Sequence, residues 1–351
     1  MTPKQFLQAI KPVAAWASKK STLQILECLR FRDGRVLATD THGQATYPIE
    51  GVKELDCCVN AAAIMRALSA MPSDEELKIK AEPNEIVLRA GRSRHRLSTL
   101  PAQDMPTLDI PESDDGAIII PRLSEMFNRL QPFMAVNDVR HYLNGICLHD
   151  SAGRLRAAAT DGHRIAVQDM GSNQGLAKAI VPAFAVRRLT SLSNPKVVVQ
   201  QEAKTMHVFD GSMTYSFKLI DGIYPDIDRV IPRPSGSPVK VKKAEFSAAL
   251  ASAAVSSNDE NKGGVNIMLF NESAVLKCDS KSGISSEGGF DFDYPGPHPE
   301  IRVSMNVEYI RDVVSATLAD TVEWFPNQTN GNLFRDPLDE GFTAVIMPMR
   351  I

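Results

Sequence analysis

The amino-acid sequence predicts an α+β fold in which one unit occurs three times, each copy consisting of two helices packed on antiparallel sheets. Three observations support this prediction. A strand and turn containing Thr-Asp recurs along the chain, segments with helical spacing of apolar residues come in pairs, and hairpin turns separate segments of alternating polarity. A length of 351 residues leaves room for three domains of ordinary size.

The repeat is clearest between the first and second copies. Val36–Tyr47 matches Arg156–Val167 in apolar pattern and turn, with Thr39 aligned to Thr160 at an offset of 121 residues. A second set of matched positions, at an offset of 119, comprises Leu100 with Leu219, Pro106 with Pro225, and Asp109 with Asp228. In a third, fainter copy, Val275–Asp279 takes the place of the Thr-Asp strand, with Asp279 aligned to Asp161.

Periodicity assigns two helices to each copy. They are expected over residues 3–16, 60–70, 122–134, 183–192, 243–255 and 307–318. Hairpins are expected about turns at residues 33–34, 150–153, 210–211 and 271–273. Turn-rich stretches near residues 114–116 and 233–236 predict domains of residues 1–115, 116–235 and 236–351.

Composition excludes several classes of protein. Hydrophobic residues make up 43% and charged residues 23%, and no apolar run approaches the ~20 residues that span a bilayer. Met1–Trp16 lacks the apolar core and cleavage site of a signal peptide, so a cytoplasmic protein is expected. The five cysteines show no Cys-x-x-Cys spacing and are expected to be buried hydrophobes, so neither a metal nor a cofactor is predicted.

Charge is divided unevenly between the expected helices and the rest of the chain. The expected helices with the residues beside them, counted over 1–26, 59–70, 121–134, 182–192, 242–254 and 306–317, contain 12 Lys and Arg against 4 Asp and Glu, although the whole chain has a net charge of −3. For any single helix the simpler interpretation is a solvated face. Repetition over several helices favours sequence-independent binding of duplex DNA, because phosphates attract a basic surface whatever the base sequence. No zinc spacing, RNA-binding aromatic motif or helix-turn-helix indicates base recognition.

Together with the repeat, four motifs resemble the bacterial DNA polymerase III beta subunit, the sliding clamp. They are Arg140–Gly145, Ala159–Arg164, Lys218–Asp226 and the closing Met347–Arg350. The resemblance covers the whole chain and is strongest in the middle copy. It implies three clamp domains per chain and a ring of two chains joined head to tail, with helices around a central hole and sheets outside.

The implied function is that of a polymerase processivity factor without catalytic residues. The resemblance implies binding of double-stranded DNA regardless of sequence, the DNA polymerase III alpha subunit, a clamp loader and other proteins with a clamp-binding motif. Such partners insert a short peptide containing Gln and Leu or Phe between the second and third domains. The matching positions here are Leu143, Thr160, Gly162, His163, Arg164, Ile165, Pro225, Arg229, Val230, Asn306, Tyr309, Val345, Ile346, Met347, Pro348, Met349 and Arg350.

Within this cleft we expect an apolar wall and a charged rim. Leu143, Ile165, Val230, Val345 and Ile346 would supply the wall, and Arg164 and Arg229 the rim. Lys262 stands where the family often has an aromatic residue. The run from Val345 to Met349 is too apolar to be left in water, so it either lines this groove or is simply the last core strand.

The resemblance also implies DNA-facing and ring-closing positions. The DNA-facing positions are Lys20, Arg66, Asn137, Arg140, Tyr142, Arg187 and Arg188. The ring-closing positions aligned with the family are His95, Leu97, Ser256 and Ser257. Spacing and charge add Arg92, Arg94, Arg96, Glu287 and Asp291. Closure is therefore expected to be polar, with alternating arginines on a predicted strand opposite the acids Glu287, Asp291 and Asp293.

Two other functions fit parts of the sequence. Asp161 and His163 could form an acid–base pair beside Cys147 or Ser151, but neighbouring side chains in a tight turn point apart. The first copy also keeps the turn as Thr39–His42, as a structural element would. The second alternative is a clamp-like protein that does not encircle DNA and competes for clamp partners, which a polar ring-closing surface favours.

Overall fold

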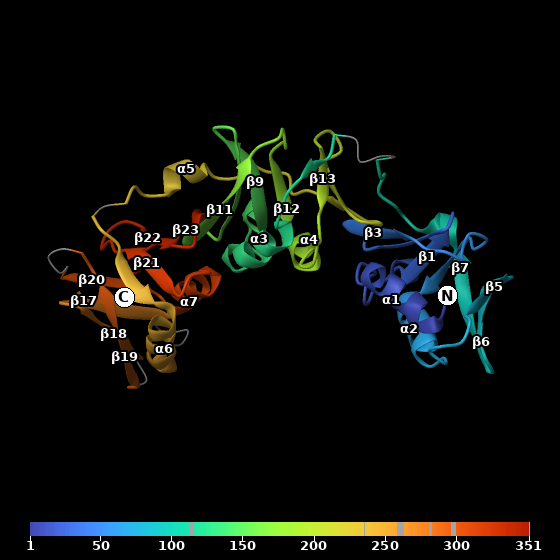
Figure 1. The fold of residues 1–351 in the computed structure, drawn as a ribbon, viewed down its shortest axis with the longest axis horizontal. Helices are drawn as coiled ribbons and strands as arrows, with labels where there is room; N and C mark the ends of the chain where they lie inside the picture. The colour runs from blue at the N-terminus through green and yellow to red at the C-terminus, as the bar shows by residue number, and fades with distance from the viewer. Residues whose placement is uncertain (112–115, 235, 258–262, 281–282, 296–299, 351) are drawn as a thin grey trace. The chain divides into compact units, whose positions relative to one another are not determined.

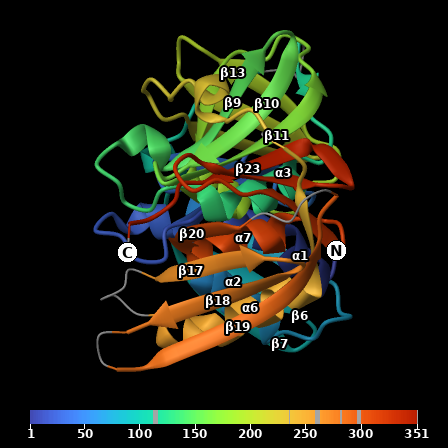
Figure 2. The same ribbon diagram turned by 90° about the vertical axis from the view of Figure 1, so that its left-hand side faces the viewer.

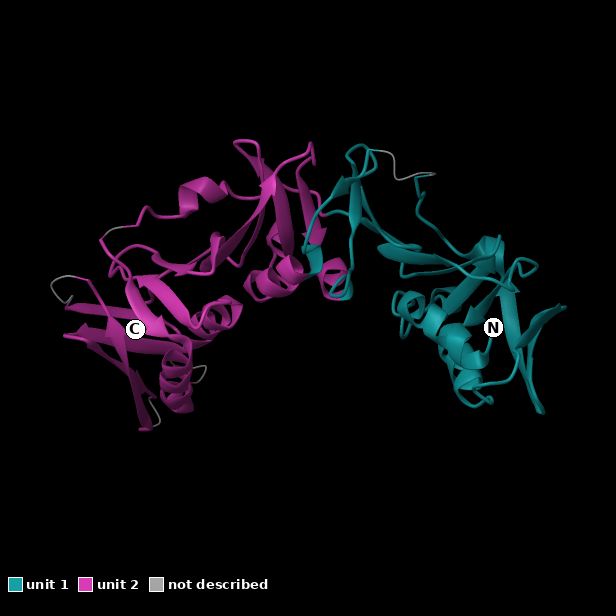
Figure 3. Ribbon diagram, viewed as in Figure 1, with its two compact units in different colours: residues 1–124, 188–219 teal, residues 125–187, 220–351 magenta. Residues whose placement is uncertain are grey.

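A computed structural model describes the chain except for residues 112–115, 235, 258–262, 281–282, 296–299 and 351. The described chain forms two compact units, residues 1–124 with 188–219 and residues 125–187 with 220–351 (Figure 3). The predicted division into three domains stays a prediction. Its boundaries fall partly at residues outside the described ones, as do Lys262 and Ile351.

Unit 1 is built on a sheet of 11 strands in the order β5-β6-β7-β4-β1-β2-β3-β15-β14-β13-β8. The strands are β1 Cys28–Arg32, β2 Arg35–Thr39, β3 Gly43–Pro48, β4 Cys57–Asn60, β5 Lys78–Glu82, β6 Glu85–Ala90, β7 Ser93–Pro101, β8 Ile118–Ile119, β13 Lys196–Gln200, β14 Thr205–Asp210 and β15 Met213–Lys218. Helices α1 (Pro3–Ala14) and α2 (Ala61–Ser69) lie side by side against one face of these strands (Figure 1).

Local sequence explains where these helices begin and which face they bury. Thr2 forms a capping box with Gln5, and Asn60 accepts the amide of Ala63 at the start of α2. Phe6 and Ile10 lie one turn apart in α1 and are buried, as amphipathic spacing predicts.

Unit 2 is built on a sheet of 12 strands in the order β12-β9-β10-β11-β23-β22-β21-β16-β19-β18-β17-β20. The strands are β9 Gly145–Ser151, β10 Arg154–Thr160, β11 Arg164–Ser172, β12 Ala179–Pro182, β16 Val239–Lys242, β17 Gly264–Phe270, β18 Ser273–Asp279, β19 Ser285–Asp293, β20 Ile301–Asn306, β21 Thr321–Phe325, β22 Asn332–Asp336 and β23 Asp339–Ile346. The helices are α3 Leu123–Leu130, α4 Ala183–Arg188, α5 Ile227–Val230, α6 Lys243–Ala253 and α7 Val307–Ala316. The first residues of α3 and the last residue of α4 belong to unit 1. Strands β17, β18 and β19 run side by side with α6 and α7 behind them (Figure 2).

The six predicted helices and four predicted hairpins are confirmed, with shorter ends. Helix α3 gives way at Gln131 to a 3-10 turn that contains Pro132, because proline has no amide hydrogen to continue the helix. Helix α4 stops at Arg188, before the Ser-, Thr- and Pro-containing stretch 190–195. Periodicity missed α5 because four residues are too few to show a helical period.

The five cysteines are free and buried, as predicted. Burial raises the pKa of the Cys147 thiol to about 12, so this group stays protonated at neutral pH. No helix among the residues that the structure describes has the length and apolar character needed to cross a membrane.

Candidate functional site

The candidate site is built on strand β11. One face of this strand contacts α7, and the other contributes to an apolar cluster. The strand pairs with β10 on one side and with β23 on the other, from Arg164 opposite Ile346 to Gln168 opposite Phe342. Side chains alternate between the faces of a strand. Arg164 faces α7, so Ile165 faces the opposite side of the sheet, where apolar residues collect.

This apolar cluster contains three of the residues predicted for the cleft wall. Leu143, Ile165 and Val345 are 2%, 3% and 1% exposed, and pack with Ile227 and Tyr224 from the segment that crosses the sheet. They form the floor beneath the site in this conformation. Ile346, also predicted for the wall, is paired with Arg164, so it lies on the helix-facing side instead.

The Thr-Asp-Gly turn between β10 and β11 is held by its own side chains. Thr160 Oγ1 donates to Arg164 O at 2.6 Å, and the Asp161 carboxylate accepts the amides of His163 and Arg164 at 2.9 and 3.0 Å. Gly162 has φ +90°, and a Cβ there would lie 2.8 Å from the Arg140 guanidinium.

The first copy of this turn is built in the same way. Thr39 Oγ1 donates to Gly43 O at 3.0 Å, and Asp40 accepts the amides of His42 and Gly43. The Thr and Asp side chains therefore have the same structural role in both copies of the turn.

The carboxyl-terminal run is both a core strand and a surface segment. Val345 and Ile346 are buried in β23, which is paired on both sides. Beyond them the Met347 amide donates to His163 O at 2.9 Å, and the Met349 amide donates to Ser304 O at 2.7 Å. Met347 is 45% exposed, so the chain end presents apolar surface beside the turn.

Exposed residues of α5 lie beside the same cluster. Ile227 is part of the cluster and Ile231 packs against it, which leaves Val230 46% exposed and Pro225 on the surface. The Arg229 side chain is 86% exposed and pairs with Asp226 at 3.0 Å. Arg229 thus fits the predicted charged rim.

Arg164 does not lie at the rim, contrary to the prediction. Its side chain is 8% exposed and pairs with Asp161 at 3.0 Å and with Asp312 of α7 at 2.5 Å. It also stacks on Tyr309, 4.1 Å from the ring centroid, and burial raises the pKa of that tyrosine. Asn306 caps the start of α7, which gives this predicted cleft residue a structural role.

Most of the predicted DNA-facing residues are accessible. Lys20, Arg66, Asn137 and Arg187 are exposed, Arg140 is bound to Asp138, and Tyr142 is half-buried. Asp138 is held with a pKa of about 2 by hydrogen bonds from Arg140. Arg188 is also half-buried, pairs with Asp40 at 2.7 Å and stacks on Trp16.

The predicted ring-closing strands carry their charges on exposed faces. Arg94 and Arg96 of β7 are exposed while His95 and Leu97 are half-buried, and Glu287, Asp291 and Asp293 of β19 are exposed, as is Arg92 in the turn before β7. Arg96 pairs with Glu85 at 2.5 Å within unit 1.

Two exposed apolar residues lie beside the predicted ring-closing positions of the third repeat. Ser256 is 3% exposed and its amide is bonded to Ser286, so it offers little surface, while Ser257 is half-buried. The adjacent Val255 is 73% exposed and Ile284 is 54% exposed. Sequence reasoning missed both, since single apolar residues near strand and helix ends resemble ordinary core positions.

Comparison with known proteins identifies the family. Models of the DNA polymerase III beta subunit match residues 118–226, by its central domain, and residues 228–350, by its C-terminal domain. A beta sliding clamp of Pseudomonas putida is 30% identical over 360 residues, covering 98% of this chain and 97% of the relative. The chain belongs to the beta sliding clamp family. An Escherichia coli beta sliding clamp is 29% identical over 325 residues, covering 90% of this chain and 85% of the relative.

Solved clamp structures agree in fold along the entire chain. The DNA polymerase III subunit beta of Pseudomonas aeruginosa has a TM-score of 0.90 at 26% identity, covering 100% of this chain and 99% of that one. The sliding clamp of the same organism bound to griselimycin has a TM-score of 0.88 at 26% identity, covering 100% and 98%. The resemblance and the α+β fold are confirmed, and this clamp is a DNA polymerase processivity factor. The competing decoy interpretation is not favoured.

Proposed function

We propose that this clamp forms a ring of two chains joined head to tail, each with domains 1–115, 116–235 and 236–351. The ring encircles duplex DNA regardless of sequence. It tethers the DNA polymerase III alpha subunit, a clamp loader and other partners through a peptide cleft. This cleft lies over the line of pairing between β11 and β23, called the β11–β23 seam below. The turn at Asp161 and His163 serves the fold, and the proposed role includes no catalytic step.

The observation that carries the ring proposal is a repeated seam between strands. Strand β3, which follows the Thr-Asp turn of the first repeat, pairs with β15, the last strand of the second. Strand β11, which follows the same turn in the second repeat, pairs with β23 of the third. By the same rule β19 should pair with β7, and in a head-to-tail dimer that β7 belongs to the second copy.

Both strands have a segment available for this pairing. Residues 93–98 of β7 pair only with β6, and residues 285–289 of β19 pair only with β18, within the described chain. An edge with unpaired amides and carbonyls is a template for another strand.

The repeat also predicts the register of the closing seam. Ala166 pairs with Ala344 of β23, and Ala45 pairs with Tyr215 of β15, on the helix-facing side of each seam. Ser286 is the corresponding residue of β19, because its hydroxyl donates to Ala253 at the end of α6. His95 of the second copy is then its partner, because it follows the β6–β7 turn as Tyr215 follows the β14–β15 turn.

This register brings complementary side chains together. Ile284 would meet Leu97 of the second copy, and Glu287 would meet its Arg94, each pair lying on one face of the sheet. It also revises the sequence alignment of the third repeat. Asp279 pairs with Ser285 as Thr160 pairs with Ile165, so Asp279 takes the place of Thr160 and not that of Asp161.

Light scattering across a dilution series tests the ring. A mass twice the 38.4 kDa of one chain is expected, and Ile284→Asp should shift the protein towards the monomer without unfolding it, because Ile284 is 54% exposed. A wild-type protein that is monomeric at all concentrations would rule out the ring.

The cleft proposal rests on the exposed apolar residues above a buried floor. Met347, Val230 and Pro225 are accessible, and methionine adapts to different anchor side chains. Burying one Leu or Phe anchor contributes roughly 1.5 to 3 kcal/mol.

Fluorescence anisotropy with a labelled Gln-Leu-x-Leu-Phe peptide tests the cleft. Deleting residues 347–351 should abolish binding while the dimer and the melting temperature stay close to wild type, because β23 ends at Ile346. Unchanged affinity in the truncated protein would refute the assignment.

A further inference from the structure

The helix-facing side of the β11–β23 seam carries a buried arginine beneath the proposed cleft. Arg164 lies on β11, and its guanidinium donates to Asp161, to Asp312 of α7 and to Pro132 O at 3.0, 2.5 and 2.6 Å. These partners come from the turn, from α7 and from the segment after α3. One side chain therefore ties three elements to the strand whose opposite face is the cleft floor.

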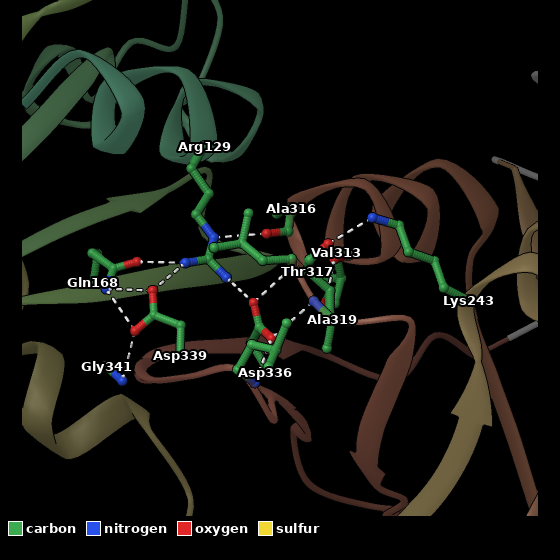
Figure 4. A network of polar contacts seen from close by, with 12 residues as sticks. Arg129, Gln168, Lys243, Val313, Ala316, Thr317, Ala319, Asp336, Asp339 and Gly341 are labelled. Atoms are coloured by element: carbon green, nitrogen blue, oxygen red, sulfur yellow. Dashed lines mark hydrogen bonds and ion pairs between the residues drawn. The ribbon is translucent and has the colours of Figure 1, made fainter. Parts of the chain in front are cut away.

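A second buried arginine holds the other end of the same seam (Figure 4). Arg129 of α3 donates to Gln168 of β11 at 2.8 Å and to Asp339 of β23 at 2.6 Å, and it lies 3.8 Å from the ring centroid of Phe342. Its Nε donates to the carbonyl at the end of α7, Ala316 O, at 2.7 Å.

Asp336 completes this network. It is 2% exposed and accepts a hydrogen bond from Arg129. It also accepts the backbone amides of Leu318 and Ala319 at 2.6 and 3.2 Å, just beyond α7. The chain after α7 is therefore fixed to the same guanidinium that fixes β11 and β23.

We propose that Arg129 and Arg164 are positioning residues of the partner-peptide cleft, which hold the β11–β23 seam in its binding-competent geometry without touching the peptide. Each joins the part of the chain matched by the central-domain model to carboxylates in the part matched by the C-terminal-domain model. The inference rests on the proposed cleft function. Both side chains are 8% exposed, and Arg164 points away from the cleft face.

Physical chemistry favours a geometric role over a purely stabilising one. A buried ion pair gains little stability over a well-packed apolar pair, because the charges must be desolvated. The planar guanidinium, in contrast, donates hydrogen bonds to carboxylates and carbonyls only in fixed directions. Two such groups at opposite ends of five paired residues restrict how β11 and β23 can shift against each other.

The kinetics of peptide binding distinguish positioning from contact. If losing the arginine lowers the fraction of competent clefts, the association rate constant falls by that fraction while the dissociation rate constant stays the same. Loss of a direct contact acts mainly on dissociation. We expect Arg164→Met to slow association about tenfold, corresponding to a competent fraction of about one tenth.

Stopped-flow anisotropy with the labelled peptide, on the full-length protein, is the test. Arg129→Met should show the same signature as Arg164→Met, whereas Met347→Ala should accelerate dissociation. Arg154→Met is the matched control, because Arg154 also pairs with an aspartate of β11, Asp169 at 2.5 Å, but its side chain is 54% exposed. This control should bind like wild type.

Asp312→Asn provides a variant that keeps the size of the side chain, should Arg164→Met fail to fold. It should also slow association, but by a smaller factor than Arg164→Met, because Asp161 and Pro132 still hold Arg164. Faster dissociation, or unchanged rates in folded variants of Arg164 and Asp312, would overturn the inference while leaving the cleft intact. Absence of binding by the wild-type protein would instead refute the cleft function.

Discussion

At the scale of single residues, the sequence predicted which apolar side chains pack together but not which way the charged ones point. Leu143, Ile165 and Val345 were expected together and do pack together. Arg164 was expected beside Ile165 at the rim and lies on the opposite face of the sheet. Adjacent residues of a strand point to opposite faces, so a run of family positions cannot all face one cleft. Arg129 belongs to no sequence motif, and the proposed role follows only from its contacts with the buried Asp336 and the half-buried Asp339.

Burial separates two kinds of cleft substitution. Leu143→Asp should lower the melting temperature strongly, because an unpaired charge would enter a site that is 2% exposed. Met347→Asp should leave the melting temperature within a few degrees of wild type and weaken peptide binding by at least tenfold, since Met347 is 45% exposed. Thermal melts and anisotropy titrations on both variants check this expectation. Equal stability of the two variants would show that the floor is not part of the core.

A buried histidine in unit 1 should make stability depend on pH. His207 is fully buried between Ser216 and Thr205, and burial lowers its pKa from 6.5 to about 4. Between these values the unfolded chain binds the proton and the folded chain does not, so stability falls as pH drops from about 6.5 towards 4. The melting temperature of His207→Gln should fall less than that of wild type between pH 7 and 5. Parallel curves for the two proteins would contradict the assignment.

At the scale of elements, local pattern predicted the helices and hairpins but not the seams. Apolar period, capping residues and turn residues lie within a few positions of each other, and they placed α1 and the β1–β2 hairpin correctly. The pairing of β3 with β15 joins strands about 170 residues apart, and no local signal specifies it. Once the β3–β15 and β11–β23 pairings are known, the repeat predicts the third pairing, of β19 with β7 of a second copy.

The proposed closing seam should respond to salt and to charge reversal. Glu287 and Arg94 of the second copy would form an exposed pair, worth about 0 to 1 kcal/mol and screened by salt. The dimer should therefore dissociate more readily at high salt, and Glu287→Arg should weaken it further. Combining Glu287→Arg with Arg94→Glu should restore it, as measured by analytical ultracentrifugation. An undiminished defect in the double variant would show that this register is wrong.

At the scale of the whole molecule, charge segregation would have a function in the proposed ring. Taken together, the six predicted helical segments are basic although the chain is acidic overall, and only the last of them lacks the excess. If these helices face duplex DNA, a few phosphate contacts give weak binding that falls steeply with salt. Retention on DNA must then come from the closed ring and not from affinity. The repeat and the charge pattern can be read from the sequence, whereas the ring is what the family resemblance implies. The proposed closing register follows from the strand edges of β7 and β19.

Retention after loading on DNA is the measurement that tests this account most directly. The clamp would be loaded by a clamp loader onto nicked circular DNA, and release would then be followed at moderate salt before and after the circle is cut once. A topologically held ring should stay on the circle and slide off the linear product. Equal retention on the two forms would contradict encirclement.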